Sequence, residues 1–285
     1  MPDWGRLRPS RFSLRAVRVK LPRPVAGRRG TLLAPSFGSF SGEEDMPHRL
    51  HTSGEPIHNR LLASLPEAEF ERLQPHLERV ALKAHQRLMT PGKRTEHVYF
   101  LESGLVSMIL TLEDGATIEI GLIGDEGLVG ILPALGASSV ASEAIVQIAG
   151  VGLRIRTAVL RGEVGLNPPL REALVRFLEA LFVQITQTVA CNGHHTVRQR
   201  LARWLLMAAD RGNTDAITLS HEFLAMMLGV RRPSVTIALA ELKDTGLVAT
   251  GRGRIIIKNR KALERAACEC YSTVKMEYDR LLNYA

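Results

Sequence analysis

Short apolar runs of alternating pattern dominate the chain between residues 80 and 156. Apolar residues at every second position are typical of strands with one buried face, and the glycines between the runs favour tight turns. The runs that we predict as strands are 98–101, 105–112, 117–123, 144–148 and 152–155. Helical spacing precedes them at 59–65 and 67–77, with Pro66 opening the second helix. The pattern predicts a compact antiparallel β domain behind two short helices.

After Pro168-Pro169 the apolar spacing changes to three and four residues, which is typical of a long amphipathic helix. We expect this helix to pair with the same helix of a second copy of the chain, because an apolar stripe on a long helix implies a partner helix. The alternative is that the stripe covers the β domain of its own chain. The pattern ends at Asn192-Gly193, which we expect to be a hinge. The apolar residues expected at the dimer interface are Leu174, Phe177, Leu181 and Ile185.

Residues 218–247 have the signals of two short helices joined by a tight turn. Ser220 can cap a first helix at 221–228, since its hydroxyl can accept a hydrogen bond from a free amide of the first turn. Gly229 suits the left-handed residue that ends a helix, and Val230 can pack the turn. Pro233 favours the first position of a second helix at 233–243. The arrangement predicts a helix-turn-helix motif.

The second helix has one apolar face and one polar face. Val235, Ala238, Leu239 and Leu242 recur at steps of three and four, so we expect them to be buried. The residues that we expect to contact DNA at the start of this helix are Arg231, Arg232, Pro233, Ser234, Thr236 and Ile237.

The segment GLVATGRGRIIIKN predicts a hairpin directly after this motif, with strands at 247–250 and 255–258 and a turn at 251–253. A hairpin in this place is a wing. It would carry Arg252 and Arg254 to the phosphate backbone, where cations give affinity without selecting a base.

Positive charge is concentrated on the same part of the chain. Residues 196–261 hold 12 Lys and Arg against 5 Asp and Glu, whereas residues 46–195 hold 13 against 16. A basic patch that coincides with a helix-turn-helix favours double-stranded DNA as the partner. Residues 1–45 are also basic, and we expect either a disordered tail or a misassigned start codon.

Three cysteines, Cys191, Cys268 and Cys270, are too few for a disulfide framework, which favours a reducing cytoplasm. Cys268 and Cys270 form a C-x-C pair that could bind a metal or respond to oxidation. No second pair of ligands has a suitable spacing, so we expect ordinary helix packing and no metal site. The adjacent His194 and His195 point in different directions on a helix, so we expect neither a pH sensor nor a metal site there. No apolar run is expected to span a membrane.

Three segments in chain order resemble the Crp/Fnr family of bacterial transcription regulators over residues 57–262. They are PGKRTEHVYFLESGLVSMIL, GLVGILPALG and ITLSHEFLAMMLGVRRPSVTIALAELKDTGLV. The resemblance implies an α+β fold with an N-terminal antiparallel β-roll, a long dimerisation helix and a C-terminal winged helix-turn-helix. The expected segments are the tail at 1–45, the β-roll at 46–168, the dimerisation helix at 169–192, the DNA-binding domain at 193–262 and a C-terminal helix at 263–285.

The resemblance also implies base or phosphate contacts by Arg231, Arg232, Ser234 and Thr236. Family members commonly carry a second basic residue where this chain has Ile237, so a thymine methyl contact could replace a guanine contact. The operator sequence therefore cannot be copied from relatives.

The positions that match the family's effector pocket differ from those of members that bind cyclic AMP. Those members use Gly-Glu and Arg-Ser pairs, whereas this chain has Gly130-Ile131 and Ala141-Ser142. Loss of the arginine removes a charge-assisted contact to phosphate, so cyclic AMP is not expected to bind. An iron-sulfur sensor would need N-terminal cysteines, and none precedes Cys191. A haem would need an axial ligand such as His76, His85 or His97. We predict no cofactor, and the effector is unknown.

These observations predict a cytoplasmic homodimeric transcription factor that binds a palindromic site in double-stranded DNA. The family resemblance adds RNA polymerase as a partner. The alternative is a small-molecule sensor or protein-interaction module that does not recognise DNA sequence. No Walker loop, G-x-S-x-G, zinc-protease helix or dinucleotide fingerprint is present, so we do not expect an enzyme.

Overall fold

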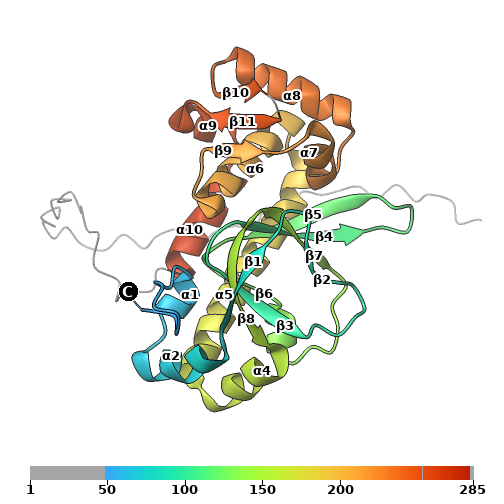
Figure 1. The fold of residues 1–285 in the computed structure, drawn as a ribbon. Coiled ribbons are helices and arrows are strands. Elements are labelled where there is room, and N and C mark those ends of the chain that lie inside the picture. Colours follow the sequence, from blue (N-terminus) through green and yellow to red (C-terminus); the bar gives the residue numbers. More distant parts are fainter. Residues whose placement is uncertain (1–48, 252, 283–285) are drawn as a thin grey trace, which may run out of the picture. The chain divides into compact units, whose positions relative to one another are not determined.

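The computed structural model describes residues 49–251 and 253–282 (Figure 1). The predicted tail at 1–45 and the wing residue Arg252 lie outside the described residues. The chain continues with two short helices, α1 (Arg60–Ala63) and α2 (Glu67–Leu73), and a 3₁₀ turn, η1 (Gln74–His76). Pro66 is the N-cap of α2, one position before the place predicted for it.

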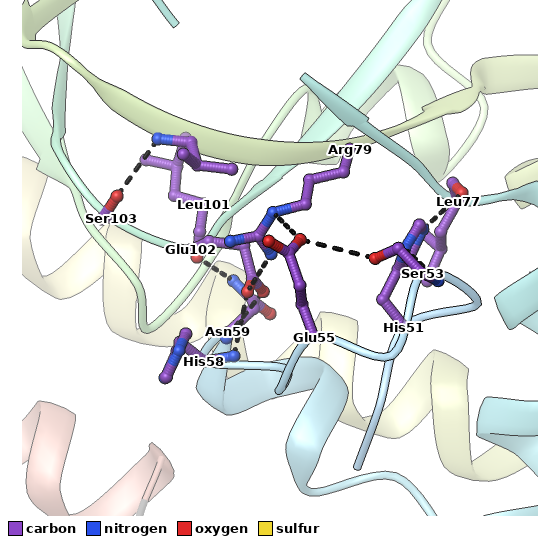
Figure 2. A network of polar contacts seen from close by, with 11 residues as sticks. His51, Ser53, Glu55, His58, Asn59, Leu77, Arg79, Leu101, Glu102 and Ser103 are labelled. Atoms are coloured by element: carbon purple, nitrogen blue, oxygen red, sulfur yellow. Dashed lines mark hydrogen bonds and ion pairs between the residues drawn. The ribbon is translucent and has the colours of Figure 1, made fainter. Parts of the chain in front are cut away.

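The N-terminal segment is held to the β domain by a buried polar network around Asn59 and Glu102 (Figure 2). The side-chain amide of Asn59 donates to the carbonyl of Leu101 at 2.8 Å, and the backbone amide of Asn59 donates to Glu102 Oε1 at 3.0 Å. Arg79 bridges Glu102 and Glu55, with N–O distances of 3.3 and 2.7 Å. Helix α1 is therefore fixed against the β domain although it has only one turn.

The β domain consists of two four-stranded antiparallel sheets (Figure 1). The first has the order β1 (Glu78–Leu82), β8 (Gly150–Arg156), β3 (His97–Leu101) and β6 (Leu128–Val129). The second has the order β2 (Arg87–Met89), β7 (Glu143–Ile148), β4 (Leu105–Thr111) and β5 (Thr117–Ile123). All five predicted strands are confirmed within two residues at each end. The pattern missed β1, β2 and β6, because runs of two to five residues, one with a register shift, leave little periodicity.

Helices α3 (Ile131–Ala134) and α4 (Thr157–Leu166) lead into the long helix α5 (Pro168–His194). The Asn167 side chain caps α5 by accepting from the amide of Leu170 at 3.1 Å. The expected break at Asn192-Gly193 is wrong, because α5 continues through both residues to His194. One helical glycine costs about 1 kcal/mol, which the packing of the rest of α5 outweighs. The chain turns at His195 instead, and Thr196 caps the next helix.

The apolar stripe expected at a dimer interface is mostly buried within its own chain. Leu174, Phe177 and Leu181 are at most 2% exposed, and Ile185 is half-buried against the same core. Helix α5 lies so close to the β domain that a Cβ on Gly127 would be 2.0 Å from Phe177 Cε2. The assignment of this stripe to a dimer interface is therefore wrong for its buried members, and the alternative of intramolecular cover is confirmed.

Helix α5 is also long and apolar enough to cross a membrane, with a mean hydropathy of 1.3 over 18 residues. This corrects the expectation that no run has that length. Its apolar composition matches a helix whose one face packs in the core of a protein, because Leu174, Phe177 and Leu181 are buried.

The C-terminal part begins with α6 (Val197–Gly212) and β9 (Ala216–Thr218). The helix-turn-helix follows as α7 (His221–Leu228) and α8 (Arg232–Asp244), and then the hairpin of β10 (Val248–Gly251) and β11 (Arg254–Ile257). The single C-terminal helix expected at 263–285 is wrong: α9 (Arg260–Ala266) and α10 (Cys270–Leu282) are separate. Helix α10 packs along α5. The break between them brings Cys268 and Cys270 to the end of α5, as described below.

Candidate nucleic-acid interface

The turn between α7 and α8 forms from the three local signals in the sequence. Ser220 Oγ accepts from the amide of Phe223 at 3.1 Å and so caps α7. Gly229 ends α7 at φ +58°, a conformation that L side chains rarely adopt. The amide of Val230 then donates to Ala225 O at 2.9 Å. The two helices differ in direction by 105°, which lies within the range of DNA-binding helix-turn-helix motifs.

Helix α8 presents the faces that its periodicity predicts. Val235, Ala238, Leu239 and Leu242 are at most 3% exposed. The residues expected to contact DNA lie on the opposite side: Arg231, Arg232, Pro233, Thr236 and Ile237 are exposed, and Ser234 is half-buried. Ile237 is 62% exposed although it is apolar. We name this exposed set, with Ser234, the recognition face.

Two hydrogen bonds fix Thr236 on the recognition face. Its hydroxyl donates to Arg232 O at 3.2 Å and lies 3.0 Å from Nδ1 of His221. Because the hydroxyl hydrogen is used on Arg232, His221 Nδ1–H is the donor of the second bond. Sequence reasoning did not select His221, and its place next to the cap Ser220 was the available signal. The bond holds the first turn of α7 against the start of α8.

The wing consists of three strands, because β9 pairs with β11 and β11 pairs with β10. Strand β9 has only three residues and was not predicted. A cavity of about 380 Å³ separates the wing from the starts of α7 and α8. Arg232 lines this cavity from α8 and Arg254 lines it from β11. Two guanidinium groups on one cavity suit a phosphate group, to which arginine can donate two parallel hydrogen bonds.

The recognition face is not covered by the β domain. The helix-turn-helix contacts the β domain through α7 and the turn, where a Cβ on Gly229 would lie 2.8 Å from Ile118 Cδ1. On the same side the ring of Phe223 lies 6.2 Å from that of His85. Helix α7 thus faces the β4–β5 hairpin, while Arg231, Arg232 and Ile237 remain exposed.

A buried polar group connects this hairpin to α6. Glu119 on β5 accepts from Ser107 Oγ at 2.5 Å and from Trp204 Nε1 at 2.8 Å. Burial raises the pKa of Glu119 to about 7, against the opposing effect of these two hydrogen bonds. Nearby, Arg211 of α6 forms a buried ion pair with Glu126 at 3.0 Å and lies over the Tyr278 ring of α10 at 4.5 Å.

The positions that match the family's effector pocket line a small apolar cavity. Gly130, Ile131 and Ser142 lie together there, whereas Ala141 is exposed and does not line it. The cavity measures about 20 Å³, because apolar side chains fill it: Met89, Met108, Ile123, Val129 and Val140. It has room for about one water molecule. The haem-ligand candidate His85 contacts Phe223 instead, and His97 lies near Tyr99, with ring centres 6.5 Å apart.

This architecture defines a class: a β-roll, a long helix and a winged helix-turn-helix with an exposed basic recognition face. Residues 79–164 match the cyclic nucleotide-binding domain, and residues 199–266 match the Crp-like helix-turn-helix domain. The chain belongs to the Crp/Fnr family of transcriptional regulators. It is 31% identical over 193 residues to the transcriptional regulator LdrP of Thermus thermophilus, covering 62% of this chain and 90% of that protein.

Two further similarities agree with this assignment. The global nitrogen regulator of Synechococcus elongatus is 26% identical over 220 residues, which cover 73% of this chain and 96% of that protein. A crystal structure of a CRP-family transcriptional regulator from Thermus thermophilus superposes with a TM-score of 0.56 at 26% identity, covering 66% of this chain and 96% of that one. FixK2 of Bradyrhizobium japonicum, at 18% identity and a TM-score of 0.59 over 67% of this chain and 98% of that one, shares the fold.

Proposed function

We propose that this regulator acts in the cytoplasm as a homodimer that binds palindromic DNA, with α8 of each chain in the major groove of one half-site. The observation that carries the proposal is the recognition face, where Arg231, Arg232, Thr236 and Ile237 are exposed beside Arg254. Arginine can form two hydrogen bonds to guanine, and an apolar side chain can contact the thymine methyl group. Arg252 and Arg254 of the wing would contact phosphates. The proposed role is binding and not catalysis.

A second apolar stripe on α5 supports the dimer. Val175, Phe182 and Val189 recur at steps of seven and are 50, 63 and 69% exposed. Leu178 and Ile185 lie between them at the other positions of a heptad and are half-buried. Apolar residues that recur at alternating steps of three and four are typical of two helices packed as a coiled coil. The proposed interface is therefore this stripe and not the buried one predicted from the sequence, with Ile185 belonging to both.

A charge at the centre of this stripe tests the dimer. Phe182→Asp would bury a carboxylate between two helices, so we expect a monomer in analytical ultracentrifugation at concentrations where the wild type is a dimer. Ala190→Asp is the matched control, because Ala190 is exposed on the same helix outside the heptad stripe. A wild-type monomer, or a dimer that Phe182→Asp leaves intact, would contradict the proposed interface.

The effector is proposed not to be cyclic AMP. The apolar cavity of about 20 Å³ offers neither the space nor a cation for a cyclic phosphate. Isothermal titration with cyclic AMP is expected to show no binding, and a micromolar affinity would overturn this part of the proposal. RNA polymerase is proposed as a partner from the family alone, without an assigned surface.

The recognition face is tested by gel shift on a site selected from random-sequence DNA. Arg232→Ala is expected to weaken binding by about 1–3 kcal/mol and to relax the preference at one base pair of each half-site. Lys243→Ala removes the same charge from the exposed far end of α8 and is expected to have a smaller effect without change of preference. Equal effects of the two substitutions, or affinity insensitive to salt, would favour the alternative of a module that does not recognise DNA sequence.

A further inference from the structure

Three cysteines and one histidine gather where α5, α6 and α10 meet. The ligand atoms of Cys191, His195, Cys268 and Cys270 all lie within 4.8 Å of one another. The three cysteines are at most 5% exposed, and the His195 side chain is 15% exposed. None of the four contributes to the recognition face or to the proposed dimer stripe.

The fold supplies the second ligand pair that the sequence spacing did not reveal. Cys191 and His195 are four residues apart at the end of α5, a spacing that places two side chains on one side of a helix. Cys268 comes from the short connection between α9 and α10, and Cys270 is the first residue of α10. The expectation that Cys268 and Cys270 have no partner ligands is therefore wrong, since these partners lie more than 70 positions earlier in the chain.

Two distances within the cluster match those expected around a single tetrahedral ion. Zinc bonds of about 2.3 Å to sulfur and about 2.05 Å to nitrogen place two sulfurs roughly 3.8 Å apart, and a sulfur and a nitrogen roughly 3.6 Å apart. Cys191 Sγ lies 3.5 Å from Cys268 Sγ, and Cys270 Sγ lies 3.6 Å from His195 Nδ1. A four-iron cluster binds each ligand through a different iron atom and needs a wider arrangement.

We propose that Cys191, His195, Cys268 and Cys270 bind one Zn²⁺ ion. The far side of His195 supports this, because its Nε2 lies 3.2 Å from Glu269 Oε2. A carboxylate that accepts from one imidazole nitrogen fixes the tautomer and leaves the other nitrogen, here Nδ1, free to bind metal. Carboxylate, histidine and ion then lie in the order common to zinc sites.

The surrounding charge also suits a zinc ion with three thiolates, which carries a net charge of about −1. Arg200 and Arg203 are 7 and 5% exposed, and their positive charges act on the Cys191 sulfur. Among the described residues neither arginine forms an ion pair with a carboxylate. Arg203 also acts on the buried carboxyl of Glu119, and an anionic site at the cysteines would add a counter-charge for both guanidinium groups.

Four protein ligands leave no open position on the ion, so the site is structural. The ion would join the end of α5 to the α9–α10 connection, directly beside the turn at His195 from which the DNA-binding domain continues. This consequence for DNA binding rests on the proposed function, whereas the site itself does not. The class of ligand is a thiophilic divalent cation held with high affinity.

The full chain, purified under reducing conditions, tests the site without any substitution. Elemental analysis and native mass spectrometry are expected to find one zinc per chain. Replacement by Co²⁺ is expected to give the absorption of a tetrahedral ion with thiolate ligands. A metal-free chain, an iron cluster, or a Cys191–Cys268 disulfide with two hydrogens fewer in mass would each overturn the proposal.

Matched substitutions identify the ligands. His195→Ala is expected to weaken Co²⁺ binding by more than tenfold. His194→Ala alters the adjacent residue, which is exposed, and is expected to leave Co²⁺ binding unchanged. Glu269→Gln alters an exposed carboxylate that does not bind the ion, so the core packing stays unchanged. The affinity for Co²⁺ is expected to fall about tenfold or more, because the carboxylate orients His195. Equal affinities for all three variants would contradict the assignment. Zinc-loaded protein that fails to bind DNA would contradict only the proposed function.

Discussion

Replacement of Glu119 by glutamine tests the titration of the buried carboxyl group that links the β domain to α6. The carboxylate is 6% exposed and accepts from Ser107 Oγ and Trp204 Nε1, so it connects β4, β5 and α6. Glutamine has the same shape and can accept from Trp204 through its oxygen, but it cannot ionise. The substitution therefore removes a titration while the connection stays in place.

The magnitude follows from the pKa of Glu119, which burial raises from 4.5 to about 7. Below pH 4.5 the Glu119 carboxyl is protonated in both the folded and the unfolded chain, so the stability that the raised pKa contributes is fully present. Between the two values only the folded chain holds the proton, and the free energy of unfolding falls by about 1.4 kcal/mol per pH unit. The total loss between about pH 4.5 and about pH 7 is about 3 kcal/mol, with no further loss above that range.

Urea unfolding of wild type and Glu119→Gln at steps from about pH 4 to about pH 8 measures this difference. Other titrating groups affect both chains alike, so the variant is expected to gain about 3 kcal/mol relative to wild type across the window. Glu113→Gln on the exposed turn of the same hairpin is the control and is expected to give a constant difference. A constant difference for Glu119→Gln as well would refute the reasoning.

Two further predictions concern packing and charge in the same region. Glu126→Ala leaves Arg211 as a buried charge without its partner at 3.0 Å, so thermal unfolding is expected to show a loss of about 3–5 kcal/mol, against less than about 1 kcal/mol for Glu179→Ala in an exposed ion pair. Equal losses would show that the buried pair has no special role. Gly127→Ala would place a Cβ 2.0 Å from Phe177 Cε2 and is expected to destabilise by about 1–3 kcal/mol, whereas Gly162→Ala, with open space around it in α4, is expected to stabilise slightly. A stable Gly127→Ala variant would contradict the close packing of α5 on the β domain.

The DNA-binding part was predictable from the sequence because its signals are local. Ser220 and Gly229 determine the two ends of α7, whose bounds were predicted to the residue. Pro233 marks the start of α8, but it is the second residue of that helix, whereas the sequence predicted it as the first. Local signals also predict strands of five or more residues between glycine turns. Short strands such as β2, β6 and β9 depend on pairing with distant segments, so their own sequence carries little signal.

Other features depended on which faces meet in three dimensions. Helix α5 has two apolar stripes, and the periodicity could not show that Leu174 and Leu181 pack inward while Val175 and Phe182 remain exposed. The cysteine cluster required the α9–α10 connection to return to the end of α5, which no spacing in the sequence indicates. Gly130, Ile131 and Ser142 line one cavity, and only the side chains around them show how little space that cavity leaves.

The most direct test of the account is selection of binding sites from random-sequence DNA, followed by the mass of the complex on the selected site. The account predicts an inverted repeat whose half-sites are about 34 Å apart, one helical turn, bound by two chains per duplex. Selected sequences without two-fold symmetry, or one chain per duplex, would contradict it.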